Sequence, residues 1–475
     1  MAIAISRPLC VDLDGTLVKS DTLWDSLLVL ARKKPKSLWK LPGYALQGRA
    51  QFKDYVTSQV ALDVKRLPYN RPLVDFLKSE NSSGREIYLA TGADRSIAER
   101  ISDHLGLFQG VLASDGVTNL IGRAKLEMLK DRFGAGGFDY IGNASPDIPL
   151  LDCAGEGMVA NPEWPLELGL RSRKIRISRH FKDRAPLWKS ILRAARLHQW
   201  AKNTLVFLPL LLAHNLHIGG VLSAILAFLS FSFCASAAYI INDLLDLEAD
   251  RAHPQKRFRP FAAGDLSVPV GVATAAAFLL LACAGLTQLP RQFTWWILFY
   301  LLVTNAYSLA LKRIALVDVF VLSGLYTLRM VAGAAATQTP ISHWLAGLSV
   351  FLFLSLAMVK RYSELQNLRA RGARPANGRA YLLADADQLR SFGTASAYSA
   401  VVVFSIYIAG HDVTVLYRHP GWMWLIDPLM LLWLNRVWLL ATRGEMDEDP
   451  VVFAVTDRMS ILIGIAVLIV ALLAL

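Results

Sequence analysis

The pattern of apolar and polar residues divides the chain into two parts. Up to about residue 170, short apolar segments alternate with amphipathic ones, and this alternation predicts an α/β domain built on a parallel sheet. In such a domain the chemistry is expected at the carboxyl ends of the strands. Strand-like segments fit 8–12, 86–90, 110–113, 138–141 and 157–160, and helical patterns fit about 94–106, 123–133 and 146–153.

From residue 203 onward, long apolar runs replace this alternation and predict an all-α membrane bundle of about nine transmembrane helices. Lysine and arginine gather after the even-numbered runs, for example at Lys312 and Arg313. The positive-inside rule therefore places these ends in the cytoplasm. The expected spans are 203–217, 219–241, 266–289, 292–311, 315–337, 343–359, 391–410, 421–440 and 459–475.

Three segments follow from this division: a soluble domain at 1–170, a basic juxtamembrane linker at 171–195 and a membrane domain at 196–475. The linker is basic enough to be attracted to anionic lipid head groups. The first residues do not have the pattern of a signal peptide. We therefore expect a multi-pass protein of the bacterial inner membrane whose N-terminal domain is cytoplasmic.

The net charge of +12 changes this picture little. Basic residues gather at membrane edges instead of alternating with exposed aromatic residues, which argues against a nucleic-acid partner. The four cysteines have no paired spacing, so neither a disulfide framework nor a cysteine metal site is expected. The oligomeric state is left open, a homo-oligomer included.

Carboxylates follow directly on the second apolar run. Asp243, Asp246 and Asp250 are spaced i, i+3 and i+7, so one helix would carry them on a single face. Such acids can hold Mg²⁺ while phosphates complete its shell. The basic residues that come next could bind those phosphates; they are Lys256, Arg257 and Arg259. The plain alternative is a solvated loop of mixed charge at the membrane edge.

Charged residues also occur inside the apolar runs. Arg329 lies deep in the fifth run, and an intramembrane arginine indicates either a functional site or a structural pair with a buried acid. Asp318 begins the same run.

The string Asn242-Asp243-x-x-Asp246-x-x-x-Asp250 resembles the first aspartate motif of the UbiA superfamily of intramembrane transferases. Its continuation to Pro260 resembles the branch of decaprenyl-phosphate phosphoribosyltransferases. The resemblance covers residues from about 190 to the end. It includes matches at Lys202, Tyr307, Lys312, Lys360, Arg361 and the segment 449–453.

The resemblance implies transfer of 5-phosphoribose from phosphoribosyl diphosphate to a polyprenyl (decaprenyl) phosphate, with Mg²⁺ on Asp243, Asp246 and Asp250. Prenyl diphosphate users carry a second aspartate motif, whereas the matching region here has Asp318 alone, which argues against a prenyl diphosphate donor. Arg329 or Lys360 would orient the acceptor phosphate. The full set of expected substrate-binding residues is Asn242, Lys202, Lys256, Arg257, Arg259, Tyr307, Lys312, Asp318, Arg329, Lys360 and Arg361.

In the soluble part, Asp12-Leu13-Asp14-Gly15-Thr16, Thr91, Lys125 and Asp147 resemble, in order, the four signatures of the haloacid dehalogenase superfamily of phosphohydrolases. The resemblance implies a Rossmann-like fold with a small helical cap at about 20–75. It implies that Asp12 is the nucleophile and that Asp14 is the acid and then the base. Thr91 and Lys125 would hold the phosphoryl group, and Asp12, Asp14 (through its carbonyl) and Asp147 would bind Mg²⁺. Asn143 stands where many members have an acid.

Together the two halves predict a bifunctional enzyme: the membrane domain makes polyprenyl-phosphoryl-5-phosphoribose and the soluble domain removes the 5-phosphate. One alternative is an aromatic prenyltransferase that uses a polyprenyl diphosphate. Another, of a different class, is a transporter with a phosphatase-like regulatory domain. The pathway would supply an arabinose-containing envelope glycan.

Overall fold

The computed structural model describes residues 7–214, 216–370, 380–410, 416–446 and 450–475. The chain forms two compact units. The first contains residues 1–195 and 239–274, and the second contains 196–238 and 275–475. The membrane part that was expected from residue 196 thus contributes residues 239–274, with the aspartate motif, to the first unit. The domain boundaries drawn from the sequence stay a prediction.

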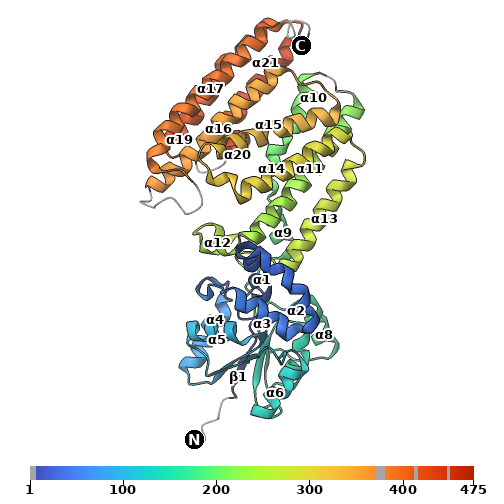
Figure 1. The fold of residues 1–475 in the computed structure, drawn as a ribbon, viewed down its shortest axis with the longest axis vertical. Coiled ribbons are helices and arrows are strands. Elements are labelled where there is room, and N and C mark those ends of the chain that lie inside the picture. Colours follow the sequence, from blue (N-terminus) through green and yellow to red (C-terminus); the bar gives the residue numbers. More distant parts are fainter. Residues whose placement is uncertain (1–6, 215, 371–379, 411–415, 447–449) are drawn as a thin grey trace. The chain divides into compact units, whose positions relative to one another are not determined.

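A six-stranded parallel sheet forms the centre of the first unit (Figure 1). Its order is β3-β2-β1-β4-β5-β6, and Val11 lies opposite Leu89 on one side and Ile141 on the other. The predicted parallel sheet is confirmed, with a sixth strand that the sequence pattern did not show. The strands are β1 (Leu9–Val11), β2 (Ile87–Asp94), β3 (Gly110–Ser114), β4 (Asp139–Gly142), β5 (Gly157–Ala160) and β6 (Arg179–Phe181).

The two faces of this sheet are both covered, which explains why its strands read as short apolar runs. Successive side chains of a strand point to opposite faces. Leu9 and Val11 join the core under α4 and α5, whereas Cys10 packs with residues of α6, α7 and α8. The covering helices are α4 (Arg71–Ser82), α5 (Arg95–Leu105), α6 (Arg123–Phe133), α7 (Ile148–Cys153) and α8 (Trp164–Ser172), and η3 (Ser145–Asp147) precedes α7.

The insert between β1 and β2 is helical. Its first helix is capped by Asp21, whose side chain accepts from the backbone N–H groups of Leu23 and Trp24. The insert contains α1 (Thr22–Lys33), η1 (Pro35–Lys40), α2 (Leu41–Gln47), α3 (Arg49–Gln59) and η2 (Val64–Arg66); α9 (Leu187–Ala195), α12 (Leu247–Ala252) and η5 (Lys256–Phe258) complete the first unit.

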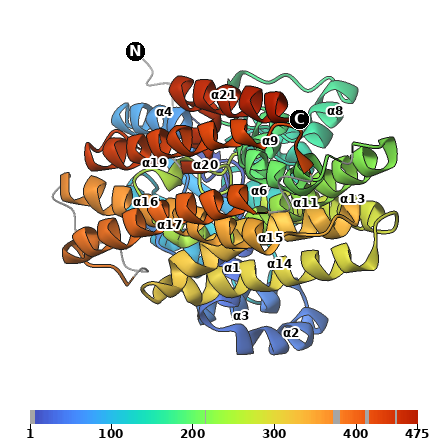
Figure 2. The same cartoon turned by 90° about the horizontal axis from the view of Figure 1, so that it is seen from above.

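Long helices make up the second unit. The helices α14, α15, α16 and α17 lie side by side in sequence order (Figure 2). The elements are η4 (Leu197–Phe207), α10 (Leu208–Leu212), α14 (Arg291–Leu309), η6 (Leu311–Arg313), α15 (Val317–Thr337), α16 (His343–Ala370), η7 (Leu383–Asp385), α17 (Ala386–Ala409), η8 (Pro420–Leu425), α19 (Ile426–Thr442), α20 (Pro450–Thr456) and α21 (Arg458–Ala474). The residues of α11 (Ile218–Leu245) and α13 (Val268–Leu286) are divided between the two units.

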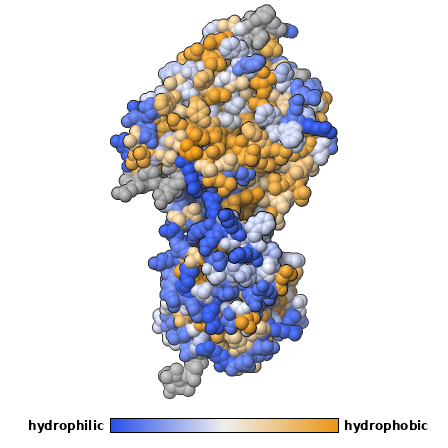
Figure 3. Space-filling model, in the orientation of Figure 1, coloured by the Kyte–Doolittle hydropathy of each residue, from blue (hydrophilic) through white to orange (hydrophobic). Residues whose placement is uncertain are grey.

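Within the described residues, six helices are long and apolar enough to cross a membrane, or up to seven if the bent pair α20 and α21 counts as one span. Nine spans are therefore not confirmed. The expected first span is instead divided between η4 and the five-residue helix α10, in which Pro209 is the second residue. Large apolar side chains such as Leu280, Trp295 and Leu302 are exposed, and apolar residues dominate the visible surface of these helices (Figure 3). This is the surface of a multi-pass membrane protein.

Candidate active sites

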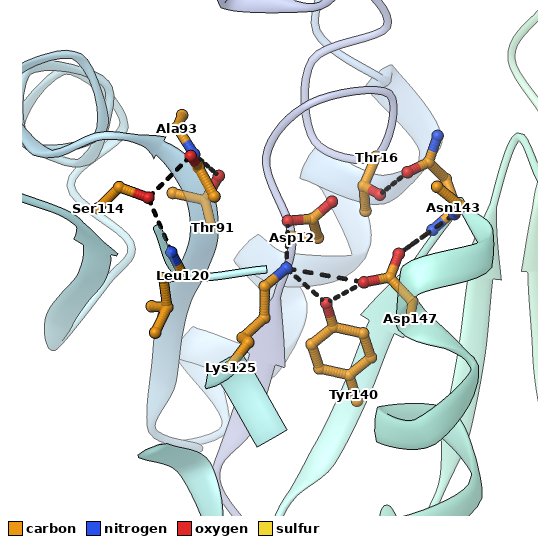
Figure 4. A network of polar contacts seen from close by, with 12 residues as sticks. Asp12, Thr16, Thr91, Ala93, Ser114, Leu120, Lys125, Tyr140, Asn143 and Asp147 are labelled. Atoms are coloured by element: carbon orange, nitrogen blue, oxygen red, sulfur yellow. Dashed lines mark hydrogen bonds and ion pairs between the residues drawn. The ribbon is translucent and has the colours of Figure 1, made fainter. Parts of the chain in front are cut away.

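The residues that resemble phosphohydrolase signatures meet at the carboxyl end of β1. Asp12 follows this strand, and Lys125 reaches it from the first turn of α6 with its Nζ 2.8 Å from Asp12 Oδ1 (Figure 4). The same Nζ lies 3.6 Å from Asp147 Oδ1. The strand order reverses beside β1, which is where ligands bind in open α/β sheets. All three side chains are buried.

Tyr140 completes this network, although the sequence did not identify it. Its hydroxyl donates to Asp147 Oδ1 at 2.7 Å and accepts from Lys125 Nζ at 3.0 Å. It projects from β4, the strand next to β1. A tyrosine in a buried strand usually belongs to the core, so no signal in the sequence distinguishes it.

Asn143 links the turn after β1 to Asp147 through hydrogen bonds. Its Oδ1 accepts from Thr16 Oγ1 at 3.3 Å, and its backbone N–H donates to Asp147 Oδ2 at 3.0 Å. The turn it supports contains Gly15, whose φ is +77° and whose added Cβ would lie 2.1 Å from Asn143 Nδ2. The amide and the glycine thus fit together only as a pair.

The other two predicted residues lie around Asp12. Asp14 Oδ1 accepts from the backbone N–H of Thr22 at 2.8 Å, which ties it to the start of α1. Thr91 lies on β2, on the opposite side of Asp12 from Asp147 in Figure 4, and its Oγ1 accepts from the backbone N–H of Ala93 at 3.0 Å.

Burial raises the pKa values of the two neighbouring acids, Asp12 and Asp14. It raises the pKa of Asp12 to about 6, although Lys125 opposes this shift. Burial also raises the pKa of Asp14 well above its usual value, and Asp21 adds to the effect. Two carboxyl groups with such different surroundings suit a nucleophile and a proton donor.

Two carboxylates of this network suit a divalent cation. Asp12 and Asp147 lie close enough to share one ammonium group, and Mg²⁺ commonly takes one or two carboxylates, with waters and phosphates as its other ligands. In the ranges that the structure describes, no three His, Cys, Asp or Glu side chains converge as a metal cluster. The donor set therefore fits an ion that phosphate helps to bind.

The aspartate motif spans a break between two helices. The helix α11 ends at Leu245, and Asp246 has φ −93° and ψ 11° before α12 begins. The single helix expected to carry all three aspartates is therefore interrupted at Asp246. Asp243 and Asp250 are instead held together by Arg259, whose Nη1 lies 3.0 Å from Asp243 Oδ1 and 2.7 Å from Asp250 Oδ2.

Asp246 also has a basic partner. Its Oδ1 lies 3.1 Å from Arg32 Nη2, which comes from the last turn of α1. A second pair follows between Arg251 and Asp25 at 2.7 Å, and both side chains are almost fully buried. These pairs could not be predicted from the sequence, because their members lie more than 200 positions apart.

The other residues that were expected to bind substrate near these acids differ in their exposure to solvent. Lys256 and Arg257 are exposed on η5, which leaves them accessible to a ligand. Asn242 lies in the last turn of α11, Lys312 on η6 and Lys360 on α16, all of them half-buried. Asp449 of the 449–453 motif lies outside the described residues.

In the second unit, Arg329 is enclosed by aromatic rings. Its guanidinium lies 5.1 to 5.6 Å from the ring centres of Phe231, Tyr300 and Tyr326, and its Nε donates to Asn203 Oδ1 at 2.9 Å. Within the part of the chain that the structure describes, no carboxylate forms an ion pair with it. The alternative of a structural pair with a buried acid is therefore not supported.

Lys202 brings a second buried cation to the same place. Its Nζ lies 5.6 Å from the centre of the Tyr326 ring, the ring that Arg329 also contacts. Both side chains are less than a tenth exposed. Two buried cations therefore contact one aromatic ring.

Asp318 and Arg361 form a closed network. Arg361 Nε lies 2.5 Å from Asp318 Oδ2, and Tyr381 Oη donates to Asp318 Oδ1 at 2.5 Å. Arg361 also donates to Tyr307 Oη and to Glu364 Oε2, each at 2.7 Å. Both carboxylate oxygens of Asp318 are therefore engaged by protein groups, and Tyr381 is a member of the network that the sequence did not indicate.

Comparisons with known proteins agree with this architecture. A model of the UbiA prenyltransferase family matches residues 204–473. The uncharacterized protein y4nM of Sinorhizobium fredii is 38% identical over 461 residues, which cover 96% of this chain and 89% of that protein. The decaprenyl-phosphate phosphoribosyltransferase of Mycobacterium tuberculosis is 35% identical over 59% of this chain and 93% of its own length.

Among solved structures, a UbiA homolog from Archaeoglobus fulgidus bound to GPP and Mg²⁺ has a TM-score of 0.45 at 18% identity, and the match covers 58% of this chain and 99% of that one. The family model covers more than half of the sequence, and the y4nM relative matches it almost from end to end. On these two matches, the chain belongs to the UbiA prenyltransferase family.

Proposed function

We propose that this protein transfers 5-phosphoribose from phosphoribosyl diphosphate to a polyprenyl phosphate, and that its N-terminal domain then removes the 5-phosphate. The first step is suggested by the relative of known activity, which is a decaprenyl-phosphate phosphoribosyltransferase. The second step is suggested by the arrangement of Asp12, Lys125 and Asp147.

The engagement of Asp318 is the observation that favours this donor. A prenyl diphosphate donor would call for a second acidic motif with free carboxylates. Here the only acid of the corresponding segment, 318–322, accepts short hydrogen bonds from Arg361 and Tyr381. A metal ion on Asp318 would have to break contacts at both carboxylate oxygens, whereas Arg259 engages one oxygen of Asp250, so we assign Asp318 to structure.

The basic groups of the second unit support an anionic acceptor. Arg329 and Lys202 carry buried positive charge around the Tyr326 ring. A phosphate that enters such a site exchanges water for charge-assisted hydrogen bonds. The acceptor phosphate is itself the nucleophile: its oxygen forms a bond to C1 of the ribose as the bond from C1 to the diphosphate breaks. Orientation of the two anions then supplies much of the rate.

The donor's diphosphate is assigned to the aspartate motif and the bases that follow it. Mg²⁺ on Asp243 and Asp250 would neutralise charge on the leaving diphosphate. Lys256 and Arg257 are exposed and can pair with its oxygens.

In the phosphatase step, an oxygen of Asp12 attacks the 5-phosphoryl group and the bond between phosphorus and the ribose 5-oxygen breaks. Asp14 gives its proton to that oxygen, then takes a proton from the water that hydrolyses the aspartyl-phosphate, and inorganic phosphate leaves. Lys125 balances charge on the phosphoryl oxygens. Mg²⁺ held by Asp12 and Asp147 would supply further charge stabilisation when bound.

The test uses purified full-length protein in lipid with labelled phosphoribosyl diphosphate, Mg²⁺ and polyprenyl phosphate. The expected product is a dephosphorylated ribosyl lipid, whereas the Asp12→Asn variant should accumulate the 5-phosphorylated lipid. Absence of any labelled lipid, together with product from polyprenyl diphosphate and 4-hydroxybenzoate, would contradict the proposed donor. Equal products from the variant and the native protein would contradict the phosphatase step alone.

A further inference from the structure

Lys53 lies beside the phosphatase signatures but belongs to none of them. It projects from α3, in the helical insert, and its Nζ donates to the backbone carbonyl of Gly92 at 2.6 Å and to Asn119 Oδ1 at 3.0 Å. Gly92 directly follows Thr91, the residue assigned to the phosphoryl group. The insert thus places a cation next to the strand end that is expected to hold phosphate.

The surroundings of Lys53 fix its position. The Gly92 carbonyl also accepts from Ser114 Oγ at 2.9 Å, and Ser114 Oγ accepts from the Leu120 N–H at 3.0 Å (Figure 4). An added Cβ on Gly92 would lie 2.6 Å from Ile121 Cγ1, so this part of β2 is in close contact with the segment that contains Ile121. The ammonium group therefore rests on a rigid support.

The charge of Lys53 is not neutralised where it lies. Both of its partners are uncharged, and within the described ranges no carboxylate forms an ion pair with it. An ammonium group has three protons, and two are used by these partners. Burial lowers the pKa of Lys53, while the carboxylates of Asp14 and Asp21 oppose this effect.

We infer that Lys53 forms a second anion subsite at the phosphatase site and binds the phosphodiester of a substrate whose 5-phosphate lies on Asp12. The inference rests on the proposed function, because the intermediate lipid carries two anionic groups, the 5-phosphate and the diester at C1. The phosphate group at Asp12 is hydrolysed. The contact between Lys53 and the diester lets the enzyme distinguish the lipid-linked sugar phosphate from free sugar phosphates.

The experiment compares two substrates in the full-length protein. One is ribose 5-phosphate, which lacks the diester, and the other is a short-chain prenyl-phosphoryl-ribose 5-phosphate, which has it. For Lys53→Met we expect KM for the diester substrate to rise about 10- to 100-fold, as for loss of a hydrogen bond to a charged group, with ribose 5-phosphate hydrolysis changed less than about threefold. Lys53→Arg should restore most of the loss, because it keeps the charge.

Lys40→Met is the matched control, because Lys40 is an exposed lysine of the same insert. It should leave both substrates unchanged. An equal loss on both substrates in Lys53→Met would overturn the inference and assign Lys53 to the transferred phosphoryl group or to the loop. Unchanged KM on both would also overturn it. Failure of the native protein to hydrolyse either substrate would instead contradict the phosphatase function itself.

Discussion

The assignment of Asp318 to structure can be tested by removing its charge. In Asp318→Leu, Arg361 loses a carboxylate at 2.5 Å while its side chain stays about 2% exposed. Removing one partner of a buried ion pair typically costs about 3–5 kcal/mol of stability, and the Glu364 carboxylate that Arg361 keeps at 2.7 Å places the expected cost at the low end of this range. At about 2–4 °C per kcal/mol for a domain of comparable size, the transition should fall by roughly 6–12 °C.

The double variant Asp318→Leu with Arg361→Met removes both charges. Replacing a buried pair by apolar groups is often neutral or stabilising, so the double variant should recover most of the lost stability. The remaining partners of Arg361 tolerate its loss, since Glu364 is partly exposed to solvent and Tyr307 is half-buried. Thermal unfolding in detergent, followed by tryptophan fluorescence, measures both effects.

Transferase activity distinguishes a structural role of Asp318 from a role in substrate binding. If Asp318 is structural, transferase activity should follow stability: lost in the single variant near its transition temperature and regained in the double variant. A double variant as stable as the native protein but without activity would refute the reasoning and return Asp318 to the substrate-binding set. A single variant with native stability would refute the premise that the pair is buried and closed.

Three further results are expected. Phosphatase activity should rise as the pH passes about 6, because Asp12 must lose its proton, and fall at higher pH as Asp14 loses the proton that it donates; equal rates at about pH 5 and about pH 7 would contradict this. Tyr140→Phe should lower kcat about 10- to 100-fold, since its hydroxyl contacts two charged groups, whereas Tyr88→Phe, whose hydroxyl bonds Glu86, should leave kcat unchanged. Arg329→Met should raise KM for polyprenyl phosphate at least about tenfold, with Arg329→Lys intermediate; a native KM in both variants would exclude Arg329 from the acceptor site.

The sheet could be predicted because its central strands are buried on both faces and read as apolar runs. The edge strand β6 could not, because Arg179 and His180 are exposed and only Phe181 faces the core. Its pairing with β5 depends on backbone hydrogen bonds, which leave no pattern of side chains. The first membrane run was misjudged for a related reason: Pro209 starts a short helix where average hydropathy suggests one long helix.

The site residues divide in the same way. Asp12 and Lys125 could be found because each lies in a short segment whose chemistry is local. Tyr140 and Lys53 could not, because their proposed roles depend on contacts between separate segments of the chain, such as that of Tyr140 with Lys125, 15 positions away. The spacing of the aspartates grouped Asp243 with Asp250, and the two do lie together. It did not predict why: Arg259 joins them across a break in the helix.

The contact of Arg259 with two aspartates bears on how a metal ion would bind to them. Its guanidinium offsets the mutual repulsion of Asp243 and Asp250, so the pair is assembled when the chain folds and before any ligand arrives. A divalent ion that takes both oxygens must exchange with this side chain. The arginine released by such an exchange would lie beside the ion and would suit a phosphate oxygen of an incoming ligand. Arg259 would thus link the binding of a metal ion to the binding of phosphate.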